Sequence, residues 1–279
     1  MPPKLIKLYT QNNDFQYIET LRRNREKRHQ QREFFIEGVR PINQALRYRW
    51  QINAFAYARD ITLSGWARQI LAESRAKRHY EMPPALLKLL SQKEETSELL
   101  ALVEMPADDF QRIPTRAQLL VVVFDRPSSP GNLGTLIRSC DALGVDGLVI
   151  TGHAVDVYDP ETISATTGSL FALPVVRKSS YQALRPWIDD LRQKWGAVQI
   201  VGTDEKGAVT LDQHDFTIPT ILLVGNETWG LSKAYQEWCD TMVSIPMAGA
   251  ASSLNVACAT SIVLYEIDRQ RRTLAPGDL

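Results

Sequence analysis

The pattern of apolar and polar positions changes near residue 119. Beyond it, continuous apolar runs such as "LLVVVFD" and "GLVIT" alternate with helix-like segments such as "NLGTLIRSCDAL". Apolar runs separated by helices are typical of a parallel sheet that is covered on both faces. The alternation continues to a final helix, expected at about residues 252–272. We therefore predict an α/β domain built on a parallel sheet.

The first hundred residues are organised differently. A basic helix, a short strand at "FFIEG" and a second helix are expected between residues 14 and 49, followed by short apolar patches at "AFAYA" and "LLALVEM". The stretch "EMPADDFQRIPTRAQ" then has the prolines and charges of a connector. We expect a smaller N-terminal α/β domain at residues 1–106, a linker at 107–118 and the larger domain at 119–279.

Charge is distributed unevenly between these parts. The chain has 279 residues, 44% of them hydrophobic, which is enough for two cores. Lys+Arg and Asp+Glu are both 32, yet residues 1–104 contain 18 basic and 12 acidic residues. A basic first domain favours a polyanionic partner, whereas the plainer alternative is a solvated charged face.

Several classes of protein are disfavoured by composition. Three cysteines without a CxxC pair or a His cluster support neither a disulfide framework nor a zinc site. No apolar run approaches the roughly 18 residues of a membrane span, and the N-terminus lacks a secretory apolar region. We expect a cytoplasmic protein with no metal and no membrane association.

Three loops are expected at the carboxyl ends of strands, where open parallel sheets bind ligands. They contain "RPSSPGNLGTLIRSC", "LLVGNETWGLS" and "IPMAGAASSLNVACA". In the first two, Asn132 as a helix cap and Glu227 beside a helix N-terminus have adequate local explanations. The third is harder to explain, because Ser253 and Asn255 would begin a buried helix, where each polar atom needs a partner.

Together, the three loops resemble the SpoU/TrmH family of RNA ribose 2'-O-methyltransferases, within the SPOUT class. The pattern N-x-G-x-x-x-R occurs at Asn132 to Arg138, and G-x-E-x-x-G at Gly225 to Gly230. The pattern I-P-M-x-G-x-x-x-S-L-N-V runs from Ile245 to Val256. The segment "LRRNREKRHQQREFFIEGVRPINQAL" looks like the family's ribosomal-protein-like substrate-binding domain.

The resemblance implies a deep trefoil knot in the second domain, a homodimer, and S-adenosylmethionine bound in the knot. The small residues of "AGAAS" would avoid clashes where knotted backbone passes over itself. The implied catalytic residues are Arg138, Asn132, Glu227, Ser253 and Asn255. The implied cofactor-binding residues are Thr203, Gly225, Ile245, Met247 and Leu254.

The implied reaction moves a methyl group from a sulfonium to a ribose hydroxyl. Arg138 is expected closest to the chemistry, as a stabiliser of phosphate or alkoxide, because a guanidinium with a pKa above about 12 is a poor base. The proton's route, and whether Arg138 serves its own subunit or the partner, stay open. RNA would contact the basic run, with ribosomal RNA ranked before tRNA. The basic run consists of Arg22, Arg23, Arg25, Lys27, Arg28 and Arg32.

Two rival functions fit the motifs less well. A nicotinamide-dependent dehydrogenase needs G-x-G-x-x-G after its first strand, and "RPSSPGNLGT" lacks that spacing. A catalytically silent RNA-binding homologue would have damaged motifs, whereas these are intact. The roles of Trp229, as a cover for the cofactor region or a stacking surface for RNA, and of "DEKGAV", as a mobile hairpin over the pocket, are not settled by the sequence.

Overall fold

The computed structural model describes residues 2–273, which form two compact units. The first unit contains residues 2–106 together with Asp156–Ala172, and the second contains Ala107–Val155 and residues 173–273. The segment Asp156–Ala172 lies inside the range that the sequence assigned to the larger domain, but its contacts group it with the first unit.

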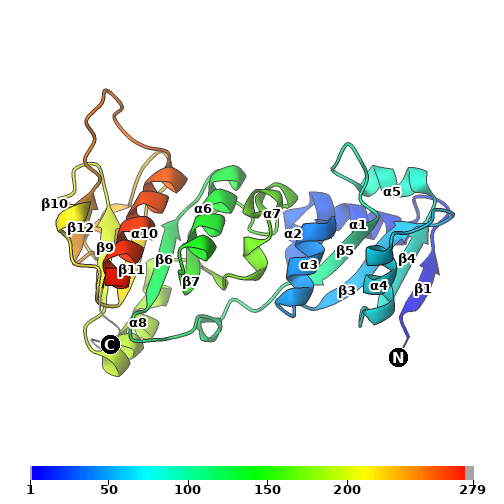
Figure 1. Cartoon of the computed structure of the whole chain (residues 1–279), viewed down its shortest axis with the longest axis horizontal. Helices are drawn as coiled ribbons and strands as arrows, with labels where there is room; N and C mark the ends of the chain where they lie inside the picture. Colours follow the sequence, from blue (N-terminus) through cyan, green and yellow to red (C-terminus); the bar gives the residue numbers. More distant parts are fainter. Residues whose placement is uncertain (1, 274–279) are drawn as a thin grey trace. The chain divides into compact units, whose positions relative to one another are not determined.

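The second unit is built on a seven-stranded, fully parallel sheet, as the apolar runs predicted (Figure 1). The strand order is β10-β12-β9-β11-β6-β7-β8. The strands are β6 (Leu120–Asp125), β7 (Gly147–Thr151), β8 (Val175–Lys178), β9 (Gln199–Thr203), β10 (Val209–Thr210), β11 (Thr220–Val224) and β12 (Thr241–Ser244). The helices are α6 (Pro130–Ala142), α8 (Arg185–Trp195), α9 (Lys233–Gln236) and α10 (Val256–Thr273), with short 3₁₀ turns at Phe110–Arg112, Tyr181–Leu184 and Leu211–Gln213.

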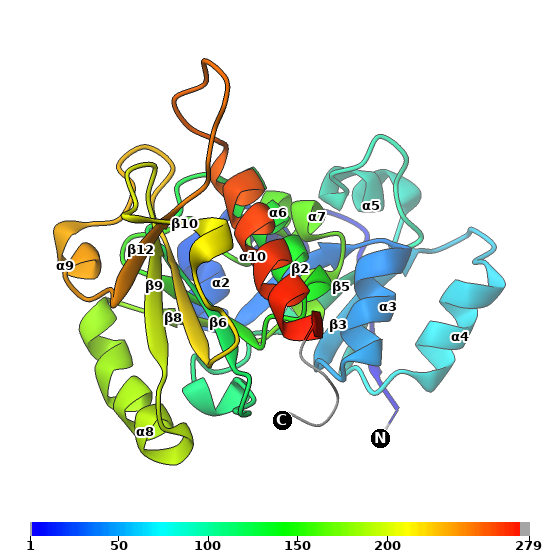
Figure 2. The same cartoon turned by 60° about the vertical axis from the view of Figure 1, so that its left-hand side comes forward.

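Helices α6 and α10 pack side by side, as both views show (Figures 1 and 2). The Oγ atoms of Ser139 and Ser261 lie 2.8 Å apart across this contact. The cap of α6 is Ser129, whose Oγ accepts from the backbone N–H of Asn132 at 3.3 Å. Asn132 was expected as the cap. Its side chain is therefore available for another contact.

The last helix begins later than expected. Residues 246–255 form an exposed loop, drawn in orange in Figures 1 and 2, and α10 starts at Val256. Asn255 caps this helix, because its Oδ1 accepts from Ala257 N at 2.9 Å and from Cys258 N at 3.3 Å. The prediction that Ser253 and Asn255 lie inside a buried helix was wrong. Gly249 also has open space where a side chain would lie, so no close backbone approach requires a glycine there.

The first unit has a mixed five-stranded sheet in the order β1-β4-β3-β5-β2. Its strands are β1 (Lys4–Lys7), β2 (Glu33–Glu37), β3 (Ile52–Ala58), β4 (Arg78–Met82) and β5 (Leu99–Glu104). Its helices are α1 (Asn13–Arg23), α2 (Arg25–Gln31), α3 (Val39–Arg47), α4 (Gly65–Glu73), α5 (Pro84–Leu90) and α7 (Pro160–Thr166), with a 3₁₀ turn at Ser169–Phe171. The expected single basic helix is two helices, because Asn24 ends α1 and its Oδ1 accepts from Lys27 N to begin α2.

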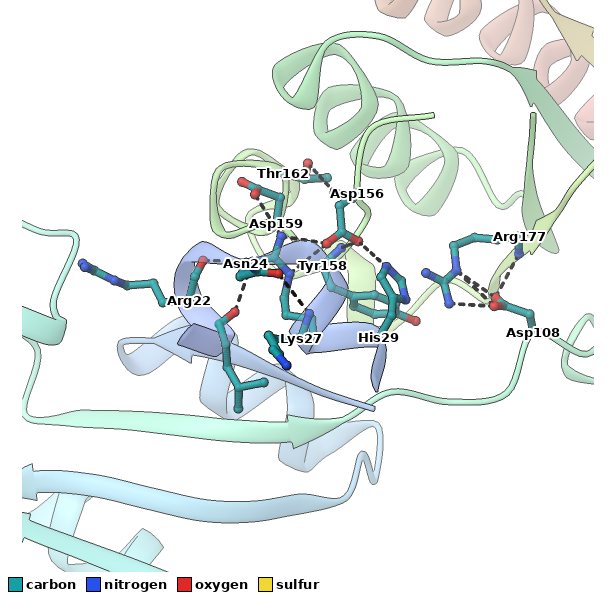
Figure 3. Close-up of polar contacts among 12 residues, drawn as sticks. Arg22, Asn24, Lys27, His29, Asp108, Asp156, Tyr158, Asp159, Thr162 and Arg177 are labelled. Carbon is teal, nitrogen blue, oxygen red and sulfur yellow. Dashed lines mark hydrogen bonds and ion pairs between the residues drawn. The ribbon is translucent and has the colours of Figure 1, made fainter. Parts of the chain in front are cut away.

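A buried ion pair ties Asp156–Ala172 into the first unit. Arg28, 1% exposed, donates from Nε to Asp156 Oδ2 at 2.8 Å and from Nη2 to Asp159 Oδ2 at 3.1 Å. Figure 3 labels both aspartates and shows Asp156 next to His29. Burial opposes ionisation of Asp156, but the hydrogen bond from His29 and the charge of Arg28 outweigh it and hold the pKa at about 2.

Aromatic packing continues the same attachment. The ring of Phe34 lies 4.7 Å from that of Tyr158 and 6.4 Å from that of Phe171, measured between centroids. Trp50 donates from Nε1 to the carbonyl of Phe171 at 3.0 Å. Residues that are distant in sequence therefore complete the core over β2.

None of the helices within residues 2–273 has the length and apolar character that a bilayer span requires. Nor do the His, Cys, Asp and Glu side chains in this range form a cluster that could hold a metal ion.

We expect Arg28→Met to lower the free energy of unfolding by about 3 kcal/mol, because it leaves the Asp156 carboxylate buried without its cation. The matched change Arg23→Met, at a side chain that is 66% exposed, should cost less than about 0.5 kcal/mol. Guanidinium unfolding, with hydrogen exchange over residues 25–37, measures both. Equal losses in the two variants would contradict the assignment.

The Arg28–Asp156 ion pair also predicts how the free energy of unfolding depends on pH. Because the pKa of Asp156 falls from 3.8 to about 2 on folding, its stabilisation is complete above pH 4 and disappears as pH falls through 2. This pKa shift contributes about 2 kcal/mol to the free energy of unfolding. Wild-type stability should therefore decline between these pH values more steeply than that of Arg28→Met.

Candidate active site

A cavity of about 390 Å³ opens at the carboxyl ends of β9, β11 and β12. This volume falls in the range of small-molecule sites. All five residues expected to bind the cofactor line it, together with Glu227 and Ser253 from the expected catalytic residues. The cofactor-set residues are Thr203, Gly225, Ile245, Met247 and Leu254. The "DEKGAV" segment contributes Asp204 and Glu205 to the same lining.

The turn after β11 closes tightly on itself. Asn226 and Gly230 exchange two backbone hydrogen bonds of 3.0 Å, and Asn226 Oδ1 accepts from the backbone N–H groups of Thr228 and Trp229. A Cβ on Gly225 would overlap the backbone of Gly230 and Leu231. Gly225 is therefore required first by the closure of this turn, whereas the sequence suggested that it makes room for a ligand.

Glu227 connects this turn to the loop before α6. Its Oε2 accepts from Ser128 N at 2.9 Å and from Ser128 Oγ at 2.8 Å, and its Oε1 accepts from Ser129 N at 3.1 Å. Partial burial alone would raise the pKa of Glu227. Hydrogen bonds from its own backbone N–H and from Ser128 and Ser129 outweigh burial and lower that pKa, so the carboxylate stays ionised.

Asn132 and Asn255 extend the connection to the third loop. Asn132 donates from Nδ2 to Glu227 Oε1 at 3.4 Å, and its Oδ1 accepts from Asn255 Nδ2 at 2.9 Å. Residues from the three loops are thus joined by side-chain hydrogen bonds. Ser253 lines the cavity and forms no hydrogen bond within residues 2–273.

A second set of contacts, which the sequence did not reveal, shapes the first loop. Arg126 has a left-handed backbone (φ 50°) and donates from Nε and Nη2 to the buried carboxylate of Asp125, at 3.1 and 2.8 Å. Asn226 donates from Nδ2 to the carbonyl of Arg126 at 2.7 Å. The Ser-Ser-Pro sequence before a helix was a signal for Ser129 as a cap, but nothing local indicated that Glu227 is its partner.

Arg138 lies apart from this site within one chain. It is exposed on α6 and does not line the cavity, and its side chain forms no hydrogen bond or ion pair with the rest of the described chain. Four of the five expected catalytic residues are therefore brought together, and the arginine is not.

The basic run is only partly available to RNA. Arg28 is buried against Asp156, so its assignment as an RNA contact was wrong. Arg22 is nearly buried and donates to the carbonyl of Ser91, and Arg32 donates to the carbonyl of Met105. Arg23, Arg25, Lys27 and Arg32 are exposed, and Arg32 is held by its bond to Met105.

We expect Glu227→Gln to loosen the loop at residues 126–132, because an amide cannot accept from all the donors that the carboxylate binds. Losing charge-assisted hydrogen bonds costs about 2 kcal/mol. Amide exchange of Ser128 and Ser129 should accelerate about thirtyfold, which is the same free energy expressed as a rate ratio. Hydrogen-exchange mass spectrometry measures it, with the exposed Glu237→Gln as control. Unchanged exchange in Glu227→Gln would refute this role.

Comparison with known proteins agrees with this geometry. The sequence model of the SpoU rRNA Methylase family matches residues 119–265, and that of the SpoU L30e-like domain matches residues 12–101. A 23S rRNA (uridine(2479)-2'-O)-methyltransferase of Streptomyces viridochromogenes is 47% identical over 96% of this chain and 94% of its own length. An uncharacterized tRNA/rRNA methyltransferase of Mycobacterium sp. (strain KMS) is 40% identical over 56% of this chain and 48% of its own length.

Solved structures lead to the same family. The SpoU methyltransferase AviRb from S. viridochromogenes, crystallised with the cofactor AdoMet, has a TM-score of 0.90 and 49% identity, covering 94% of this chain and 99% of that one. The AdoMet-bound rRNA methyltransferase from Sinorhizobium meliloti has a TM-score of 0.84 and 29% identity, and the match covers 95% of this chain and 98% of that one. With its parallel sheet, its cavity and its three joined loops, this chain belongs to the SpoU rRNA Methylase family.

Proposed function

We propose that this protein is a cytoplasmic, S-adenosylmethionine-dependent methyltransferase that modifies a ribose 2'-hydroxyl in ribosomal RNA. One observation carries the proposal: the cavity contains all five expected cofactor residues, and the Glu227–Asn132–Asn255 connection joins the loops around it. The 47% identical relative is named for this reaction on 23S rRNA.

The charge of the cavity suits this cofactor. In the described chain, the cavity lining includes the carboxylates of Asp204, Glu205 and Glu227 and no Lys or Arg. A negative cavity favours a ligand with a positive sulfonium and disfavours the pyrophosphate of a nicotinamide dinucleotide. Ile245, Met247 and Leu254 add apolar surface suited to a purine ring. These residues therefore fit S-adenosylmethionine and argue against a dehydrogenase.

When bound, S-adenosylmethionine supplies a methyl group that is already activated by the sulfonium. The chain's residues must then position the ribose hydroxyl and give its proton a route. Glu227 is poorly suited to accept that proton, because its pKa is lowered and because the N–H groups of Ser128 and Ser129 already donate to its two oxygens. It positions the loop before α6. Ser253 lines the cavity, and its hydroxyl forms no hydrogen bond within residues 2–273, so it is available to a substrate.

The position of Arg138 supports a homodimer in which it acts across the subunit contact. The side chain is exposed on α6 and lies outside its own chain's cavity. The neighbouring α10 exposes Ile262 (42%) and Tyr265 (56%), an apolar surface of the kind that subunits bury. The proposal includes the trefoil knot that the family resemblance implies. Recognition of RNA falls to the exposed Arg23, Arg25 and Lys27 of the first unit.

The proposed function predicts the product. Purified protein with labelled S-adenosylmethionine should transfer the label to unmodified ribosomal RNA, and digestion to nucleosides should release a single 2'-O-methylnucleoside, identified by mass spectrometry. Replacing Arg23, Arg25 and Lys27 with Ala should weaken the salt-sensitive part of the affinity for RNA. Transfer to tRNA alone would support the alternative substrate. A base-methylated product would refute the proposal.

Arg138→Ala should lower turnover by at least about a hundredfold, as loss of a charge-stabilising donor does, without changing cofactor affinity by calorimetry. Co-expression with Leu254→Trp, which fills the cavity, tests the partner arrangement. If Arg138 acts across the dimer, each mixed dimer has one complete site, so a random mixture recovers about a quarter of wild-type activity. If it acts within its own chain, mixing restores nothing. Equal loss of cofactor affinity in Arg138→Ala would refute its catalytic role.

A further inference from the structure

Trp229 is the most exposed large apolar side chain in the part of the chain that the structure describes. Its exposed fraction is 78%, compared with 61% for Tyr9 and 56% for Tyr265. Tryptophan is usually well buried, because its ring gains more from burial than any other side chain. A side chain this exposed contributes little to the packing of the second unit. Its ring lines the cavity, but most of the ring surface faces solvent, so covering the cofactor region accounts for only part of it.

The backbone that holds Trp229 is well fixed. Asn226 Oδ1 accepts from Trp229 N at 3.1 Å, and paired backbone hydrogen bonds between Asn226 and Gly230 close the turn on either side. Asn226 is anchored in turn to the carbonyl of Arg126. The ring is therefore presented from a preorganised turn, which lowers the entropy that a ligand must overcome on binding.

The ring stands at the rim where the substrate must arrive. Trp229 lines the cavity with Glu227, Met247 and Leu254. A ribose hydroxyl that reaches this cavity brings its base, one glycosidic bond away, to the same rim. In a structured RNA, that nucleotide must leave its base stack before its sugar becomes accessible, and unstacked bases are commonly bound on aromatic side chains.

Charge selects the base over the phosphate at this position. Asp204, Glu205 and Glu227 line the same cavity and repel the RNA backbone, whereas the face of a base is uncharged. We propose that Trp229 is the stacking platform for the unstacked base of the nucleotide that is methylated. This inference rests on the proposed function and adds to it the residue that receives the base. Stacking is tolerant of base identity, so Trp229 holds the nucleotide without choosing its sequence.

The test compares Trp229→Ala, Trp229→Leu and Trp229→Phe on 23S rRNA transcribed without modifications. Removing the ring should raise the KM for RNA about tenfold in the Ala and Leu variants, as expected for one lost stacking contact. The Phe variant should recover most of the affinity, because a smaller ring still stacks. Cofactor affinity by calorimetry should stay unchanged in all three. Ile218→Ala, which removes an exposed apolar side chain before the amino end of β11, is the matched control.

A binding readout separates this inference from the reaction itself. RNA should quench a component of tryptophan fluorescence that is present in the wild type and missing in Trp229→Phe. A wild-type KM in Trp229→Leu, a parallel loss of cofactor affinity, or a change in subunit number by light scattering would each overturn the platform. If the wild-type protein binds RNA with this quenching but transfers no methyl group, the proposed function fails. The assignment of the stacked base to a methylated nucleotide then fails with it, and only the stacking of RNA on Trp229 stands.

Discussion

The site depends on the carboxylate of Glu227. This one group accepts from Ser128, Ser129 and Asn132, and so joins the turn after β11 to the loop before α6. Asn132 then reaches Asn255, which caps α10. Because backbone N–H groups hold both oxygens, the carboxylate stays ionised and its geometry is determined by the loops themselves. Three loops that are far apart in sequence thereby become one rim.

The distribution of charge between the parts of the molecule is consistent with the proposed function. The cavity lining is acidic, which suits a sulfonium, while the exposed cations of α1 and α2 suit a polyanion. The basic run nevertheless serves two purposes, because Arg28 holds Asp156 inside the first unit. A cation that is paired and buried in this way contributes to folding, so the proposed contacts with RNA are left to its exposed neighbours.

The larger elements were predictable where many residues carry the same signal. Continuous apolar runs identified β6 and β7, because strands buried on both faces have few polar positions. The short elements were missed or misjudged. The four-residue α9 is shorter than a helical pattern can specify, and the two-residue β10 has too little pattern to detect. The start of α10 was placed too early, since Ala and Ser are compatible with both helix and loop.

The sequence by itself determined the parallel sheet, the family and several of the residues that line the cavity, because these follow from local patterns and from motifs whose spacing survives in the chain. Tertiary structure alone decided how those residues are used. It showed that Glu227 is held by the first loop, that Gly225 permits a turn to close, that Arg28 is buried and that Arg138 lies outside its own cavity. These outcomes depend on contacts between residues up to about 130 positions apart, and no local pattern records which partner a side chain will meet.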